Sequence, residues 1–283
     1  MSIICLNNRS ILSITGIDSV SFLQGIITQD LKKVTNNKII YSLILTPKGR
    51  YESDIFIINN DNKILLDIPS TQLNVVINKL NFYKLNRKIK ITNITNQWKI
   101  ITLFKGSYLI DLPKEALCFN DPRNLNIGKR VLWPKNIKLP VFVQHKINVY
   151  KNHILSLGIP ESDKDLINGK TIPLEANMEF LNAISWDKGC YLGQEFTTRS
   201  HYQGTIRKRI LPVEIKGNIP YPQTTIFYKD KKAGYFSSGY KKQGLALLRL
   251  EYVLESIKKS INFKTSTTNL TASIPSWIKL TKY

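Results

Sequence analysis

Three apolar runs separated by short turns constrain the fold of this chain more than any other feature. Residues 39–45, 54–58 and 63–68 are rich in β-branched side chains, and residues 46–49 and 59–62 between them have the composition of tight turns. Strands joined by turns this short pair antiparallel, because parallel strands need a crossover of a dozen or more residues. The first third of the chain therefore predicts an antiparallel meander rather than a βαβ array.

Helical periodicity appears around this meander. We predict a strand at residues 11–15, a short helix capped by Asp18, a clear helix capped by Ser70 and a further helix over residues 145–157. Helices and antiparallel strands in separate segments predict the α+β class.

The last third of the chain is rich in short strands. Glycine, proline and lysine turns separate predicted strands at residues 209–215, 225–228, 245–250 and 277–280. This spacing predicts a separate small β-barrel, in which Lys258-Lys259-Ser260 forms a solvated turn.

Charge and composition narrow the functional classes. The chain carries 41 Lys and Arg against 20 Asp and Glu, a formal charge of +21, which attracts polyanions but is also expected from an AT-rich genome. No apolar stretch reaches the roughly 18 residues of a membrane span, and residues 1–13 show no targeting pattern, so we predict a cytoplasmic protein. Cys5, Cys118 and Cys190 lack the paired spacing of a metal site or disulfide framework, and no metal site is predicted.

One segment, residues 186–195, concentrates chemically active side chains. Cys190 stands two residues after Lys188 and before a predicted helical turn near Leu192, so the ammonium and the helix N-terminus both favour the thiolate. Cys190 is therefore a candidate nucleophile, redox centre or soft-metal ligand. The alternative is a small buried apolar residue, with Lys188 pointing to water.

The neighbours of Cys190 support a site. Gly189 and Gly193 suggest unusual backbone torsions or a close approach of the main chain to a ligand. Glu195 and Arg199 stand at i and i+4, where they could form an ion pair on one helix face.

This segment resembles the signature of the YgfZ family, folate-binding relatives of the T-protein of the glycine cleavage system. The signature K-G-C-Y-x-G-Q-E followed by Arg is matched by Lys188-Gly189-Cys190-Tyr191-x-Gly193-Gln194-Glu195 and Arg199. Similarity extends along nearly the whole chain, through Phe22-Leu23-Gln24-Gly25, Pro47-Lys48-Gly49-Arg50, Asp121-Pro122-Arg123 and Pro173-Leu174-Glu175.

The resemblance implies a fold and a function. It implies a folate-binding α+β body of interlocked subdomains at residues 1–204, divided near residue 95 into 1–95 and 96–204, and a C-terminal β-barrel at residues 205–283. It further implies a tetrahydrofolate-dependent accessory factor for the assembly or maintenance of [4Fe-4S] proteins, radical tRNA-thiolating enzymes included. Its partners are then folate and iron–sulfur client or scaffold proteins, with no membrane partner, and the chain is expected to be a monomer.

The same resemblance suggests roles for individual residues. Cys190 and Lys188 form the reactive site, where Cys190 contacts an iron–sulfur species transiently. The expected folate-binding residues are Gly189, Tyr191, Gly193, Gln194, Glu195, Arg199, Glu175, Gln24 and Arg50. Capping and surface roles are the alternatives for Gln24, Arg50 and Glu175, and Tyr191 could instead cover the interface with the barrel.

Two other classes of function remain open from the sequence. A tetrahydrofolate-dependent aminomethyl transferase would use Glu175 or Asp187 to hold the pteridine, but Pro173 stands where such enzymes usually carry arginine. An RNA-binding or tRNA-modification module is suggested by the basic and aromatic residues 202–209, although nucleic acid is the less favoured partner. Whether the chain turns over a substrate at all is left open.

Overall fold

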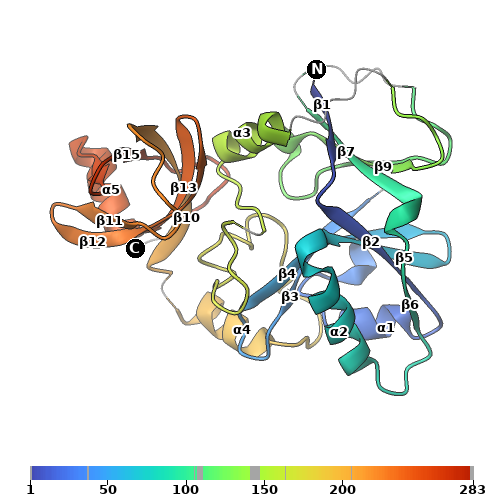
Figure 1. The fold of residues 1–283 in the computed structure, drawn as a ribbon. Helices are drawn as coiled ribbons and strands as arrows, with labels where there is room; N and C mark the ends of the chain where they lie inside the picture. The colour runs from blue at the N-terminus through green and yellow to red at the C-terminus, as the bar shows by residue number, and fades with distance from the viewer. Residues whose placement is uncertain are drawn as a thin grey trace. The chain divides into compact units, whose positions relative to one another are not determined.

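The computed structural model describes residues 2–36, 38–104, 106, 111–140, 147–162, 164–204 and 206–280. The chain divides into two compact units, one made of residues 1–147 and 181–194 and the other of residues 148–180 and 195–283. Figure 1 shows the elements of both. The division of the chain predicted from sequence, at residues 95 and 204, stays a prediction.

The first unit contains a five-stranded antiparallel sheet in the order β3-β4-β5-β2-β6. Consecutive pairing of β3, β4 and β5 confirms the predicted meander. The five strands are β2 (Arg9–Thr15), β3 (Ile40–Leu45), β4 (Tyr51–Asn60), β5 (Lys63–Pro69) and β6 (Lys90–Asn93).

Helices α1 (Ser19–Gln24) and α2 (Leu73–Lys84) cover one face of this sheet (Figure 1). Leu66 and Ile57 point toward the helices, whereas the alternate residues point to the other face, as the period of two in a strand requires. Asp18 stands at the N-cap of α1 as predicted but its side chain makes no capping hydrogen bond, and the cap predicted at Ser70 is wrong. The Asp18 carboxylate accepts the amide of Lys88 instead of a helix amide, and Ser70 begins a separate 3-10 turn, η2 (Ser70–Gln72), ahead of α2.

A second sheet in this unit has the order β1-β7-β9-β8 and is antiparallel. A buried ion network links the two sheets, since Asp67 on β5 accepts hydrogen bonds from Arg9 Nε at 2.7 Å and from Arg130 Nε at 2.6 Å. The Arg130 guanidinium lies 4.0 Å from the centroid of the Phe56 ring. The strands are β1 (Ser2–Leu6), β7 (Trp98–Phe104), β8 (Leu117–Asn120) and β9 (Lys129–Pro134), and the other short turns are η1 (Leu31–Lys33), η3 (Thr95–Gln97) and η4 (Leu125–Ile127).

The second unit contains a closed barrel in the order β10-β13-β12-β11-β14-β15, closed by the pairing of β15 with β10. The predicted C-terminal barrel is therefore confirmed. Its core includes Phe236, Leu248 and Phe263, and Phe180 packs against it from outside the barrel. The strands are β10 (Lys208–Lys216), β11 (Thr225–Tyr228), β12 (Lys231–Tyr240), β13 (Gln243–Arg249), β14 (Phe263–Lys264) and β15 (Asn269–Ala272).

Three helices of this part of the chain are α3 (Ile147–Leu157), α4 (Gln194–Tyr202) and α5 (Leu250–Lys259). The predicted start of the third helix at His145 lies outside the described residues. Across the described residues, no helix combines the length and the apolar character that crossing a bilayer requires.

Two predictions for the C-terminal third are wrong. Residues 277–280 form no strand, because the indole N–H of Trp277 donates to the carbonyl of Leu157 and Ile278 closes a turn onto Pro275. Lys258 and Lys259 belong to the last turn of α5, where cations favour the negative end of the helix dipole, and Ser260 ends the helix in the left-handed conformation.

Candidate functional site

Lys188 anchors the segment before Cys190 to the first unit. Its side chain is buried, and Nζ donates to the main-chain carbonyls of Gln24 at 2.7 Å, Ile27 at 2.7 Å and Gln29 at 3.1 Å. Burial lowers its pKa to about 8, and the nearby Asp30 opposes this shift. All three ammonium protons are used by carbonyls, so the partners of Lys188 differ from the Cys190 thiol expected from sequence.

Gly193 fixes the segment on the other side of Cys190. Its φ of +79° favours glycine, and a Cβ atom there would lie 2.4 Å from the carbonyl oxygen of Thr46. The Leu192 amide also donates to the carbonyl of Gly25 at 3.0 Å. The unusual backbone torsion expected at Gly193 is confirmed, and its close neighbour is the turn between β3 and β4.

Cys190 itself is exposed, between these two anchored positions. Cys5 is buried and Cys118 is half-buried, and burial raises the pKa of both thiols. The fold therefore presents Cys190 to solvent on a braced segment, which rules out the alternative of a small buried apolar residue.

The unusual torsion expected at Gly189 and the ion pair expected between Glu195 and Arg199 are both wrong, whereas a close approach of Gly189 to a ligand stays a prediction. Gly189 has no positive φ, and a Cβ atom added to it would have no other atom within 4 Å, so its backbone does not require glycine. Glu195 and Arg199 are both exposed on α4, and no ion pair joins them in the part of the chain that the structure describes. Exposed pairs at i and i+4 gain little over hydration, which explains the missing contact.

The structure gathers several predicted residues in the first unit. Both amide atoms of Gln24 are engaged, since Nε2 donates to Asp30 and Oε1 accepts from the amide of Leu31. The Gln194 side chain accepts from the amide of Tyr191, and Arg50 is half-buried next to Gly49 in the turn that contacts Gly193. Gln24 and the turn that carries Arg50 therefore lie next to residues 188–194 in this unit.

The phenol of Tyr191 stands out in this group. Its side chain is buried, and its hydroxyl has no hydrogen-bond partner among the described residues. Burial raises the pKa of the phenol. A buried polar atom without a partner is a free-energy cost that a bound water or ligand can remove.

The remaining predicted residues belong to the second unit. Glu175 lies in the turns of residues 173–182, and its carbonyl accepts the amide of Ile210 on the barrel strand β10. Glu195 and Arg199 lie on α4.

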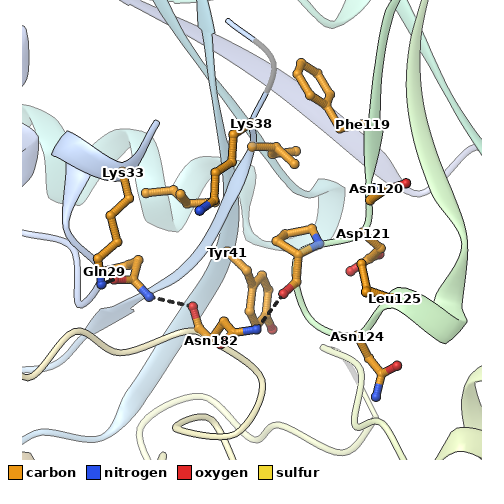
Figure 2. Close-up of a pocket in the computed structure, with 13 residues that line it drawn as sticks. Gln29, Lys33, Lys38, Tyr41, Phe119, Asn120, Asp121, Asn124, Leu125 and Asn182 are labelled. Carbon is orange, nitrogen blue, oxygen red and sulfur yellow. Dashed lines mark hydrogen bonds between the residues drawn. The ribbon is translucent and has the colours of Figure 1, made fainter. Parts of the chain in front are cut away.

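The first unit also contains a cavity of about 640 Å³ (Figure 2), within the range of small-molecule sites. Its residues come from the start of β3, the connection from β8 to β9, and the neighbourhood of Gln29 and Asn182. Gln29 donates to the carbonyl of Asn182 at 2.7 Å, and Asn182 donates to the carbonyl of Pro122 at 2.9 Å, which ties three segments together. Lining side chains include Lys33, Lys38, Tyr41, Phe119, Asn120, Asp121, Asn124 and Leu125.

The cavity has an unbalanced positive charge. Lys33 donates only long hydrogen bonds, to Gln29 at 3.3 Å and Ser185 at 3.4 Å, and neither Lys33 nor Lys38 has an ion pair within the described ranges. The carboxylate of Asp121 is already bound on both oxygens by the buried Arg123, at 3.0 and 2.8 Å. Two cations next to aromatic and aliphatic walls suit a flat ligand that carries negative charge.

Sequence reasoning missed this cavity. None of the nine residues predicted to bind folate lines the cavity. The walls of the cavity come from segments more than 140 residues apart in the chain, and local sequence motifs do not show that such segments meet. The available sequence signal was the segment Asp121-Pro122-Arg123, whose first two residues line the cavity.

A metal site is a separate question. No group of three or more His, Cys, Asp or Glu side chains that could hold a metal ion occurs among the described residues. A stable iron–sulfur cluster takes about four protein ligands, so any cluster at Cys190 needs ligands from a partner.

These features define a class of protein, a GCVT-like α+β body combined with a C-terminal β-barrel. Residues 6–105 match the GCVT N-terminal domain, and residues 207–280 match the C-terminal β-barrel domain of CAF17. The glycine cleavage system aminomethyltransferase T from Bartonella henselae has the same fold, with a TM-score of 0.77 over 98% of this chain and 86% of that one, at 10% identity.

Two sequence relatives of this chain are named as iron–sulfur cluster assembly factors. It is 29% identical to the mitochondrial iron–sulfur cluster assembly factor IBA57 of Mus musculus, across 96% of this chain and 84% of the relative. It is 31% identical to the mitochondrial IBA57 homolog of Dictyostelium discoideum, across 75% of this chain and 62% of the relative.

The relatives contradict the cytoplasmic location expected from sequence, since their names place them in mitochondria. That expectation rested on the first residues of the chain. Residues Ser2–Leu6 form β1, which pairs with β7, so their composition reflects a folded strand and carries no information about an address.

Proposed function

We propose that this chain is an accessory factor for the assembly or maintenance of [4Fe-4S] proteins and acts through the exposed thiol of Cys190. The names of its relatives support the iron–sulfur role, and we propose the mitochondrial setting that those names carry. The YgfZ-like signature around Cys190 extends the proposal to radical tRNA-thiolating enzymes as clients.

The observation that carries this proposal is the bracing of Cys190. Lys188 is held by three carbonyls on one side, and Gly193 is packed against Thr46 on the other, while the thiol between them stays exposed. A braced, exposed thiol can meet a partner's cluster or sulfur without loss of local order. One thiolate supplies one of about four cluster ligands, so we propose a shared and transient contact.

Replacing Cys190 in cells that depend on this chain tests the thiol. We expect Cys190→Ser to leave the protein folded and abundant but to lower [4Fe-4S] enzyme activities during oxidative stress. Cys118→Ser is the matched control, because Cys118 is half-buried. If Cys190→Ser supports the same [4Fe-4S] enzyme activities as the wild type, the proposed role of the thiol is wrong.

We also propose that tetrahydrofolate binds the first unit in the cavity of Figure 2. The donor set supports this ligand: Lys33 and Lys38 suit its carboxylates, Tyr41 and Phe119 suit its ring system, and the amides Gln29 and Asn120 suit the polar edge of a pterin. Folate bound there would supply one-carbon chemistry.

Binding measurements on the purified chain test the cavity. Lys33→Gln together with Lys38→Gln should weaken tetrahydrofolate binding about tenfold and reduce its dependence on salt. The matched control is Lys63→Gln with Lys90→Gln, exposed lysines of the same unit that do not line the cavity. Equal affinity of both double variants and the wild type would place the ligand elsewhere.

A further inference from the structure

An apolar tip at one end of the first unit has no role in the site described above. Ile17, Val20, Phe82 and Leu85, which we call the apolar tip, are 86, 56, 74 and 82% exposed. Single exposed apolar residues are common, but a cluster of large ones marks an interaction surface.

Ile17 and Val20 lie at the start of α1, Phe82 and Leu85 lie at the end of α2, and these two segments lie against each other. The amide of Lys88 donates to the Asp18 carboxylate at 2.7 Å, and Arg87 donates to Ser21 Oγ at 3.3 Å and lies over the Phe22 ring. The start of α1 and the connection from α2 to β6 are therefore neighbours. Figure 1 shows that this connection extends past the ends of α1 and α2.

Leu85 adds an independent observation. Its backbone has φ +47° and ψ −130°, a conformation that costs free energy in any residue with a Cβ atom. Its side chain packs little against its own fold, since it is 82% exposed. A strained leucine that points to solvent is expected where the side chain is needed for an external contact.

The charges around the apolar tip are mostly positive, with the Asp18 carboxylate as a negative charge between Ile17 and Val20. Lys84, Arg87, Lys88 and Lys90 follow each other along this connection, and the nearby Asp18 carboxylate already accepts the Lys88 amide. A second copy of the chain is unsuited as the occupant, because it would bring the same cations face to face. A duplex nucleic acid would engage the cations and leave the apolar side chains in water.

We propose that the apolar tip docks on an anionic lipid surface. An exposed apolar group flanked by cations matches the chemistry of a bilayer with acidic headgroups, since fluid acyl chains accept a convex shape and the headgroups attract lysine and arginine. The contact is peripheral and involves no spanning helix. It revises the sequence-based expectation that the chain has no membrane partner.

Co-sedimentation of the full chain with vesicles tests this proposal. The chain should pellet with vesicles of phosphatidylcholine mixed with phosphatidylglycerol and remain in solution with phosphatidylcholine alone. Phe82→Ser with Leu85→Ser should weaken binding at least about tenfold. Lys84→Gln with Lys88→Gln should weaken it roughly tenfold and reduce its salt dependence.

Matched controls separate the tip from a general effect of charge or hydrophobicity. Tyr221→Ser, and Lys231→Gln with Lys242→Gln, alter equally exposed residues of the barrel and should leave vesicle binding unchanged. Leu85→Gly should raise the thermal midpoint by relieving the backbone strain and still weaken vesicle binding. A purely structural Leu85 would not produce this pair of effects.

Several outcomes would overturn the proposal. Wild-type protein that ignores both kinds of vesicle would do so, as would tip variants that bind like the wild type. If wild-type protein ignores vesicles and the tip variants still lower [4Fe-4S] enzyme activities in cells, the tip is a docking site for an acidic protein instead.

Discussion

The two glycines that flank Cys190 should respond very differently to substitution by alanine. Gly193 has φ +79° and lies against Thr46, whereas Gly189 has open space at its Cβ position and no positive φ. Both belong to the same ten-residue segment, so each substitution serves as the control for the other. We expect Gly193→Ala to destabilise the first unit and Gly189→Ala to be nearly neutral.

The magnitude follows from the geometry at Gly193. An L-residue in a left-handed conformation costs about 1–2 kcal/mol. The new Cβ would lie 2.4 Å from the Thr46 oxygen and must move out to at least 3.0 Å, so a main-chain segment has to shift, which adds about 1–2 kcal/mol. The total is about 2–4 kcal/mol, against roughly 0.5 kcal/mol or less for Gly189→Ala.

Urea unfolding followed by circular dichroism and tryptophan fluorescence measures this difference. A loss of about 2–4 kcal/mol is a large part of the roughly 5–15 kcal/mol that stabilises a typical protein. Equal unfolding free energies for Gly193→Ala and Gly189→Ala would refute the packing of Gly193 against the β3–β4 turn, and with it the bracing of Cys190.

Three further predictions concern buried charges. Lys188 has a folded-state pKa of about 8, below its value of about 10.4 when unfolded, so the unfolded state binds more protons between these two pH values. The free energy of unfolding should therefore rise with pH in this window, by up to about 3 kcal/mol. Lys188→Met should flatten this rise in urea titrations at different pH values. Burial raises the pKa of Asp165 to about 6, so its contribution to the stability of the fold is complete below about pH 4 and is lost as the pH rises through 6. The thermal midpoint of the wild type should fall over this pH range, and that of Asp165→Asn should not. Asp67→Asn leaves Arg9 and Arg130 buried without their carboxylate and should cost about 3–5 kcal/mol in urea unfolding, and a cost below 1 kcal/mol would contradict the network.

The meander and the barrel could be predicted from sequence because their signals are local. The apolar, β-branched runs of β3, β4 and β5 and the short turns at residues 46–49 and 59–62 specify antiparallel pairing without reference to the rest of the chain. Residues 277–280 have the same apolar composition, but Trp277 is held by the distant carbonyl of Leu157, a contact that composition does not encode. Helix α5 carries a clear amphipathic pattern, which the lysines at its end obscured.

The candidate site could be predicted only in part. The motif around Cys190 singled out the segment, and the thiol is exposed in the structure. The partners of Lys188 could not be predicted, because a lysine beside a cysteine is equally compatible with a thiolate partner and with buried carbonyls. The cavity required the tertiary structure, since Lys38 and Asn182 meet only after the sheet has formed.

Calorimetric titration of the purified chain with tetrahydrofolate tests the central claim most directly when the wild type and Cys190→Ser are compared. We predict saturable binding with the same affinity for both, because the thiol does not line the cavity. Absence of binding to the wild type would contradict the folate-dependent account, and loss of binding in Cys190→Ser alone would show that the thiol belongs to the folate site.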